Sequence, residues 1–553
     1  MRRNKEQGIY PIPNRAYFFV MSGLTLLYLF KIRLGLATDE VFMVNYGKLR
    51  VDGLKCITEV WDTLQMSGWV LYPFMAVYHK LMGGYDGVFL FSRVIYLALH
   101  LGVALYTYFT LRLFWNDKQA AAASVISYLY VFSFYVVGYK SILFWGSLLT
   151  VLLLLRFIQS GYMRYVIVGA FAFCGTVLCY PTAVILVIPF TLVLKKHSIA
   201  PKRAIIAFWS ICVVCAAGTL LYCLTQMPLS SLLEIYGGVA ASERRGGMGL
   251  VLRITELLAI AIAAEGVMWL FRKIFGTASR KFYLFITIFL WLALIGIILL
   301  KYETASASRF WYVFLLFFFM ASSMIRHAEL IAERMDLIKE LFIHPTIWSI
   351  AAVVLGTNQE LATVAYGSIL GIIGITIVLF GDKYTAGYAG NLGKSLVLMF
   401  FICFLVFVKD QKTLYEVSHV FQHREELSEG PGKGIYVTEE AETEYWSVYR
   451  IAKKYVTSAD KTLILSDTFP SIGIMAADAI EVVHCGAMPY ADSPQLAKYC
   501  EYFPEYAPTV VLIDAEYVGD YEEWLSTAPF GMYLKKNYDT TPTVQDGRWI
   551  IVR

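Results

Sequence analysis

Long apolar runs fill the first 409 residues of the chain and are absent after that point. A run of about 20 apolar residues is long enough to cross the hydrocarbon core of a membrane as a helix. The chain is 58% hydrophobic and 16% charged, whereas a soluble domain averages about 25% charged residues. The runs therefore predict a polytopic α-helical membrane protein.

The lengths of these runs predict about 13 spans. The run at 342–356 is short and contains Pro345, so two topologies stay open at this point. If this run crosses the membrane, the number of spans is odd. The spans are placed at 16–33, 89–111, 119–137, 144–158, 165–180, 182–194, 204–225, 252–271, 282–300, 310–325, 342–356, 365–381 and 395–408.

Lysine and arginine positions predict the orientation, because these residues collect in cytoplasmic loops. Residues 1–409 contain 35 Lys and Arg and 19 Asp and Glu. With a cytoplasmic N-terminus, 21 of those 35 basic residues lie in inner loops such as 195–203 and 272–281. We therefore expect a plasma or inner membrane protein whose part after residue 409 is extracytoplasmic.

Residues 410–553 form an acidic region with 12 Lys and Arg and 23 Asp and Glu. "EAETEYWSVYRIAKKYV" has helical periodicity, while "TLILS", "EVVHC" and "TVVLID" are typical of short buried strands. The sequence thus predicts a multi-span domain, 1–409, and a small soluble α/β domain, 410–553. We expect no nucleotide cofactor, since the chain has no GxGxxG or P-loop motif. We expect no nucleic-acid partner either, since its basic residues lie in scattered short loops.

Two long segments lie on the predicted outer face, 34–88 and 226–251. The first has apolar residues at helical spacing with charges between them, which fits an amphipathic helix at the membrane interface. The nine cysteines show no paired CxxC motifs or histidine partners, so no zinc site is predicted. The sequence leaves open whether Cys485 and Cys500 form a disulfide.

Charged residues at the predicted outer ends of the first two spans are candidates for a site. Asp39 and Glu40 follow the first apolar run, and Arg93 lies about one turn inside the second. An arginine within a span needs an anionic partner. That partner could be Asp39, as a structural ion pair, or a lipid phosphate at headgroup depth.

A second arginine pair, Arg244 and Arg245, is flanked by glycines on the same predicted face. It fits a solvated turn. It also fits a clamp on phosphate, because a guanidinium matches two phosphate oxygens at once.

The stretches "DEVFMVNYGKLR", "GWVLYPFMAVYHKLMGGYDGVFLFSRVIYLALHLGVALYTYFTLRLFWNDKQAAAASVISYLY" and "GYMRYVIVGAFAFCGTVLCYPTAVILVIPF" occur in that order within residues 16–195. This pattern resembles the N-terminal half of GT-C fold glycosyltransferases. Within them it is similar to the branch related to bacterial protein O-mannosyltransferases and the lipid A aminoarabinose transferase. The resemblance implies transfer of a sugar from a polyprenyl-phosphate donor to a lipid, glycan or protein acceptor outside the membrane.

The resemblance also implies roles for the charged residues. Asp39 would act as the general base toward the acceptor hydroxyl. Glu40 would orient the acceptor or point into solvent. Arg93, with Arg244 or Arg245, would stabilise the departing phosphate.

The chain departs from the family pattern at several positions. Only Pro73 remains of the family's Lys-Pro-Pro, and Lys80 is a candidate replacement for its lysine. Lys140 and Ser141 stand where an acid often follows the third span, and Tyr180–Pro181 replaces a Lys-Pro pair. The missing acid predicts catalysis without a metal ion or other cofactor.

Polar residues of two further predicted outer loops are candidates for sugar binding: Glu303, Asn358, Gln359 and Glu360. Ordinary loop polarity is the favoured explanation of these residues. Two other function classes stay open from sequence, namely a lipid or polysaccharide transporter and an inactive assembly protein of the same fold. Charges at span ends and the lack of an internal repeat favour an enzyme over a transporter.

Overall fold

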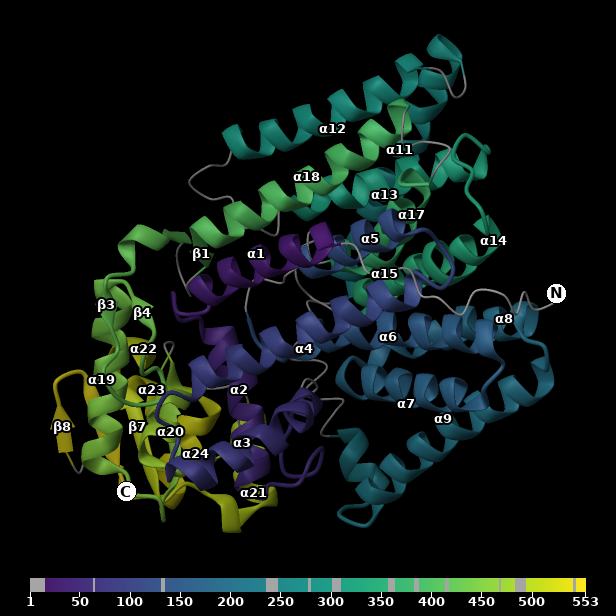
Figure 1. Cartoon of the computed structure of the whole chain (residues 1–553). Coiled ribbons are helices and arrows are strands. Elements are labelled where there is room, and N and C mark those ends of the chain that lie inside the picture. The colour runs from purple at the N-terminus through teal and green to yellow at the C-terminus, as the bar shows by residue number, and fades with distance from the viewer. Residues whose placement is uncertain are drawn as a thin grey trace.

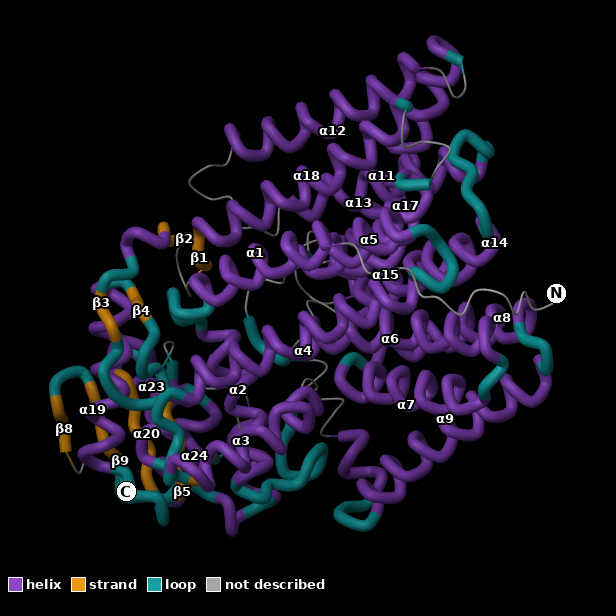
Figure 2. The backbone as a smooth tube through the Cα atoms, in the orientation of Figure 1, coloured by secondary structure: helices purple, strands orange, loops and turns teal. Residues whose placement is uncertain are grey.

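The computed structural model describes residues 15–62, 65–130, 135–234, 247–276, 280–300, 310–356, 364–381, 387–412, 417–466, 469–482, 494–540 and 544–553. Helices make up the N-terminal part (Figures 1 and 2). They are α1 (Arg15–Lys31), α2 (Thr38–Val51), α3 (Gly68–Met82), α4 (Val88–Leu111), α5 (Asp117–Leu129), α6 (Tyr139–Ser160), α7 (Met163–Cys179), α8 (Val187–His197), α9 (Pro201–Leu224), α11 (Gly247–Phe275), α12 (Arg280–Leu300), α13 (Phe310–Arg326), α14 (Met335–Ile338), α15 (His344–Gly356), α17 (Ile369–Leu379) and α18 (Tyr388–Lys409).

Among the described residues of this part, six helical segments are long and apolar enough to cross a membrane. They are Val88–Leu111, Tyr139–Ser160, Pro201–Leu224, Gly249–Phe275, Met335–Gly356 and Tyr388–Val408. The chain is therefore a multi-pass membrane protein, and the total of about 13 spans stays a prediction. The short run at 342–356 belongs to a helical segment that begins at Met335 and continues through a π-helical turn and Pro345.

Local sequence signals set the ends of several helices. Asn116 and Gln119 form a reciprocal capping box at the start of α5. Gly161 ends α6 in the left-handed conformation that glycine adopts without a steric penalty. Helices that follow each other then pack as neighbours, α6 against α7 and α4 against α5, while α17 also packs on α5.

The C-terminal part, residues 410–553, contains all the described strands (Figure 2). The strands are β1 (Asp410–Lys412), β2 (Val417–His419), β3 (Glu425–Glu426), β4 (Tyr436–Val437), β5 (Lys461–Leu465), β6 (Ile480–Glu481), β7 (Val510–Asp514), β8 (Val544–Asp546) and β9 (Trp549–Val552). The helices are α19 (Glu439–Tyr455), α20 (Pro470–Ala477), α21 (Pro494–Tyr502), α22 (Ala515–Val518), α23 (Tyr521–Thr527) and α24 (Pro529–Asn537).

A five-stranded mixed sheet with the order β6-β5-β7-β9-β8 forms the centre of this C-terminal part. β5 pairs in parallel with β6 and β7, and β9 is antiparallel to β7 and β8. Alternate residues face opposite sides of a strand. Ile464 of β5 packs with Val448 of α19, while Leu463 shares the opposite core with Phe530 of α24. Helices thus cover both faces of the sheet.

The C-terminal part is attached to one end of the helical body by main-chain hydrogen bonds (Figure 1). The Gly87 N–H, just before α4, donates to the Gly430 carbonyl at 2.9 Å. The Gly35 N–H, between α1 and α2, donates to the Tyr436 carbonyl of β4 at 2.7 Å. Both parts also contribute to one continuous buried cluster. The predicted division at residue 409 coincides with the change from helices to strands and otherwise stays a prediction.

Helix α2, which lies in the predicted outer segment 34–88, differs from the sequence-based expectation. We expected an amphipathic helix at the membrane interface. From Val41 to Arg50, α2 has only one residue that is not fully buried. The charged side chains of α2 are therefore part of a protein interior, where each needs a partner.

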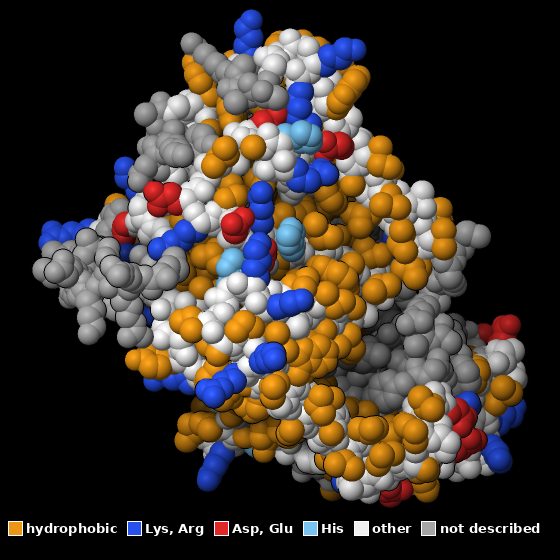
Figure 3. All heavy atoms as spheres, turned by 90° about the vertical axis from the view of Figure 1, so that its right-hand side faces the viewer, with side chains coloured by type: hydrophobic (Ala, Val, Ile, Leu, Met, Phe, Trp, Pro, Cys, Tyr) orange, Lys and Arg blue, Asp and Glu red, His pale blue; other side chains and the backbone are white. Residues whose placement is uncertain are grey.

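The end of α8 lies at the right of Figure 1. Figure 3 shows this end of the molecule face on. Lys and Arg side chains run along the middle of this face between broad hydrophobic areas. α8 ends there with Lys195, Lys196 and His197, and Lys196 forms an ion pair with Glu340. The basic end of the body thus lies away from the C-terminal part.

Replacing Gly430 tests the packing of the turn whose carbonyl accepts the Gly87 N–H. Gly430 has φ of +76°, and a Cβ there would overlap the Tyr445 hydroxyl. Gly430→Ala should lower the free energy of unfolding by about 2–4 kcal/mol, combining backbone strain with a steric clash. Gly83→Ala is the matched control, because Gly83 also has positive φ but no atom within 4 Å of its Cβ position. Equal thermal shifts for both variants would contradict this packing of the Gly430 turn on Tyr445.

Candidate active site

The ion pair between Arg93 and Glu40 lies where α1, α2 and α4 meet. Arg93 Nε is 2.5 Å from Glu40 Oε1, and Arg93 Nη2 is 2.6 Å from Glu40 Oε2. Both side chains are 1% exposed. The pair is thus bidentate and desolvated, which is the geometry in which an Arg–carboxylate interaction is strongest.

The remaining donors of Arg93 are also occupied. Its Nη1 donates to the carbonyls of Ile32 at 2.6 Å and Leu34 at 3.4 Å, and Nη2 donates to the Gly35 carbonyl at 2.6 Å. A guanidinium has five N–H groups, and each has a protein acceptor here. Arg93 therefore holds the 32–35 turn against α2, and these contacts leave no N–H for the predicted lipid phosphate.

The same contacts correct the sequence-based view of the acid pair. The sequence left Asp39 and a lipid phosphate as the two possible partners of Arg93, but Glu40 has that position. Glu40 is buried, so it neither points into solvent nor reaches an acceptor. Asp39 is exposed in the first turn of α2, where the helix dipole stabilises a negative charge. Asp39 is thus the acid that remains available to a ligand.

Asp39 lies on a face of α2 that is turned toward the start of α6. Asp39 and Met43 are four residues apart in α2, so they occupy the same side of the helix. Met43 packs so closely on Gly138 that a Cβ on this glycine would overlap Met43 Sδ. Gly138 is the residue before α6, and Lys140 follows in its first turn. The side of α2 that bears Asp39 thus packs, at Met43, against the residue that precedes α6.

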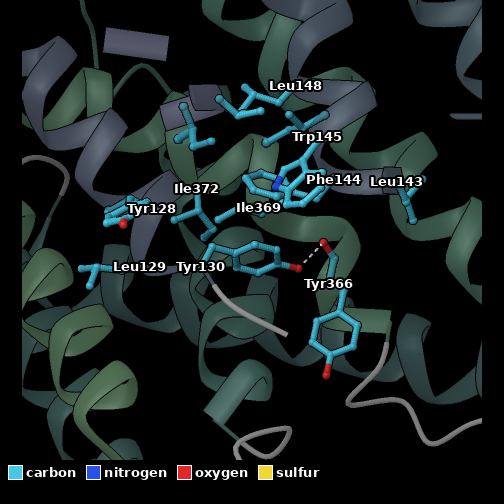
Figure 4. Close-up of a cluster of buried hydrophobic side chains, with 14 of the residues drawn as sticks. Tyr128, Leu129, Tyr130, Leu143, Phe144, Trp145, Leu148, Tyr366, Ile369 and Ile372 are labelled. Atoms are coloured by element: carbon cyan, nitrogen blue, oxygen red, sulfur yellow. Dashed lines mark hydrogen bonds between the residues drawn. The ribbon is translucent and has the colours of Figure 1, made fainter. Parts of the chain in front are cut away.

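Lys140 lines a cavity of about 20 Å³ between α6 and helices α15 and α17. Its Nζ lies 5.5 Å from the ring centroid of Tyr139 and 5.7 Å from that of Tyr366. The Tyr130 hydroxyl donates to the Tyr366 carbonyl at 2.9 Å. Figure 4 shows the Tyr366 ring pointing away from the apolar cluster around Phe144. The aromatic rings thus hold the Lys140 cation at the edge of the hydrophobic core.

Two further polar groups belong to this cavity. The Ser147 hydroxyl lines it and is buried without a hydrogen-bond partner among the described residues. The Tyr180 ring stacks on Tyr139 at 6.0 Å between centroids. A buried hydroxyl without a partner costs about 1–3 kcal/mol. The cavity has room for about one water molecule and is bordered by the Lys140 side chain and the Ser147 hydroxyl.

The C-terminal end of α2 is held by a second group of polar contacts, which joins it to the C-terminal part of the chain. Lys48 is fully buried, and its Nζ lies 2.6 Å from both Asp52 Oδ2 and the Ala479 carbonyl. His79 Nε2 lies 3.0 Å from Asp478 Oδ2. Burial raises the pKa of the Asp52 carboxyl, and the neighbouring Lys48 charge opposes that shift. α2 is thus fixed at both ends.

The other residues predicted from sequence are not brought to this place. Lys80 is exposed on α3. Arg244, Arg245, Glu303, Asn358, Gln359 and Glu360 lie outside the described residues, as does Cys485. The described part of the chain has no group of three His, Cys, Asp or Glu side chains placed to hold a metal ion.

Lys140 is the residue that sequence reasoning did not assign to the site. It was noted only as a departure from the family pattern, where an acid is expected. Its signal in the sequence is weak, because a single lysine before an apolar run also fits a membrane interface anchor. Only the packing of Met43 on Gly138 relates it to Asp39.

Comparison with known proteins gives structural likeness only. No family model and no curated protein matches the chain. The structure of ArnT from Cupriavidus metallidurans bound to undecaprenyl phosphate aligns over 97% of this chain and 98% of its own, with 10% identity and a TM-score of 0.45. Its apo structure aligns over 97% of each chain with a TM-score of 0.43 and 10% identity. The Archaeoglobus fulgidus oligosaccharyltransferase, in complex with Zn and sulfate, aligns over 94% of this chain and 71% of its own, with 12% identity and a TM-score of 0.47.

The Arg93–Glu40 contacts predict the effect of removing either charge. Arg93→Met leaves Glu40 buried and unpaired, so it should lower the free energy of unfolding by about 3–5 kcal/mol. The double variant Arg93→Met with Glu40→Leu should recover much of that loss, because no isolated charge remains. Thermal unfolding in detergent measures both variants. An Arg93→Met protein with unchanged stability but weakened donor binding would instead support the phosphate role predicted from sequence.

Proposed function

We propose that this chain is a membrane glycosyltransferase that moves a sugar from a polyprenyl-phosphate donor to an acceptor hydroxyl at the outer membrane face. The exposed carboxylate of Asp39 carries this proposal, since it lies one residue from the buried Arg93–Glu40 pair and faces the start of α6. The sequence resemblance within residues 16–195 supplies the reaction type. The positions of Asp39 and Lys140 supply a base and a cation for it.

The reaction is a single displacement in which Asp39 takes the proton of the acceptor hydroxyl. As the O–H bond breaks, the acceptor oxygen forms a bond to the anomeric carbon of the sugar. The bond from that carbon to the phosphate oxygen breaks, and its electron pair leaves with the lipid phosphate. A positioned general base contributes about 10²–10⁴-fold to such a step. Because Arg93 and Glu40 fix the first turn of α2, Asp39 keeps its position during the transfer.

The departing phosphate gains negative charge and needs a cation. Arg93 was the sequence-based candidate, but its donors are occupied by protein acceptors. We assign this role to Lys140, at the positive N-terminal end of α6. Ser147 and the ring of Tyr139 border the same cavity. Lys80, Arg244 and Arg245 stay as additional candidates for the phosphate.

The proposal places the end of the body that bears Asp39 and the C-terminal part outside the cytoplasm. The opposite, basic end in Figure 3 then faces the cytoplasm, as the distribution of Lys and Arg favours. The N-terminus is cytoplasmic in this arrangement. The enzyme would act in a plasma or inner membrane, without a metal ion, on a lipid, glycan or protein acceptor.

Asp39→Asn tests the catalytic base. The amide cannot accept the acceptor's proton, so transfer from a radiolabelled polyprenyl-phosphate sugar should fall by about 10²–10⁴-fold. Donor binding should be unchanged, because the carboxylate acts on the acceptor. Asp86→Asn is the control, since Asp86 is an exposed acid on the same end of the body. Full turnover by Asp39→Asn would exclude this mechanism.

Lys140→Ala tests the phosphate contact. Loss of a fixed cation at the leaving group should reduce transfer by about 10²-fold and weaken binding of the free polyprenyl phosphate. Lys140→Arg should keep part of both activities, since it keeps the charge. Lys80→Ala tests the alternative phosphate site on α3, and Lys433→Ala is the matched control, because Lys433 is exposed and does not line the cavity. If only Lys80→Ala reduced donor binding, the phosphate would belong at α3.

A further inference from the structure

An open groove of about 550 Å³ lies between α19 and the turn that joins β8 to β9. It shares no residue with the candidate active site. The helix side of the groove contributes Glu442, Trp446, Arg450 and Lys454, and the strand side contributes Arg548 and Trp549. The groove is therefore a second candidate binding surface.

The helix residues of the groove form an oblique stripe. Glu442, Trp446, Arg450 and Lys454 follow one another at intervals of four residues, so the stripe turns by about 40° around α19 at each step. At 1.5 Å of rise per residue, the stripe is about 18 Å long. A groove with this shape suits an extended chain rather than a compact molecule.

Hydrogen bonds hold the groove side chains in place. Trp446 Nε1 donates to Glu442 Oε1 at 2.9 Å, and Trp549 Nε1 donates to Ser447 Oγ at 2.9 Å. Arg548 Nη1 donates to Glu444 Oε1 at 3.0 Å. Both indoles and the guanidinium are thus oriented before any ligand arrives, which lowers the entropy that binding must overcome.

The charge of the groove is opposite to that of its surroundings. Residues 410–553 contain 12 Lys and Arg and 23 Asp and Glu. Arg548 in the groove lining is paired with the carboxylates of Glu444, Asp514 and Glu516. The exposed cations of the groove are therefore Arg450 and Lys454. An acidic region that gathers cations along one groove is complementary to an anionic ligand.

We infer that this groove binds a linear glycan that carries phosphate or carboxylate groups. The half-buried indole of Trp446 offers an apolar edge with a fixed polar atom, and such amphipathic rings suit sugar surfaces. Arg450 and Lys454 meet the anionic substituents. Binding itself needs no transfer reaction. The role of the groove as a dock for the acceptor rests on the proposed function.

The test uses the full-length chain in nanodiscs of neutral phosphatidylcholine. The probes are an oligogalacturonate, a neutral cello-oligosaccharide of equal length and polyglutamate, with binding followed by microscale thermophoresis. We expect the oligogalacturonate to bind, and Arg450→Ala or Trp446→Ala to weaken it by about tenfold. Lys453→Ala is the matched control, because Lys453 is exposed on α19 but does not line the groove.

Three outcomes would overturn the inference: no binding of oligogalacturonate, equal binding of polyglutamate, or equal weakening by Lys453→Ala. The experiment separates the groove from the active site. Asp39→Asn should bind the glycan normally, and Arg450→Ala should transfer sugar normally to a short soluble acceptor. Glycan binding without transfer by the wild-type chain would support the groove and contradict the proposed function.

Discussion

The buried ion pair of Arg93 and Glu40 determines how the end of the helical body next to the C-terminal part is built. An arginine inside the apolar helix α4 must find negative partners, because its charge is costly in an apolar environment. The Arg93 guanidinium donates hydrogen bonds to both carboxylate oxygens of Glu40 and to carbonyls of the 32–35 turn. One side chain thereby joins α4, the end of α1 and the start of α2. Asp39 remains outside this network and exposed.

The sequence could predict the need for this pair but not its members. Adjacent residues of a helix point about 100° apart, so either Asp39 or Glu40 could have met Arg93. The choice depends on how α2 is rotated, and packing sets that rotation. Met43 against Gly138 and Lys48 against Ala479 fix it on two sides. The sequence therefore identified Asp39 and Glu40 as candidates. Tertiary contacts decide that Glu40 pairs with Arg93 and that Asp39 stays exposed.

Elements with a strong local pattern were predictable. The expected helix around residues 440–456 is α19, and "TLILS" and "TVVLID" correspond to β5 and β7. β9 was missed, because "WIIV" is a short apolar run at the chain end without a distinctive neighbour. α2 was misjudged for a different reason. The charged residues of α2 have the spacing of an amphipathic surface helix. In the structure, however, Lys48 is buried against Asp52 and the C-terminal part.

The position of α2 relates the C-terminal part to the chemistry proposed for Asp39. One end of the helix is held by Arg93, and the other by Lys48 with the Ala479 carbonyl. A base on an exposed first turn works only if that turn keeps its orientation toward the acceptor hydroxyl. A helix anchored only at its first turn could pivot about that anchor. The second anchor prevents this, so the sheet domain serves as a structural support for α2.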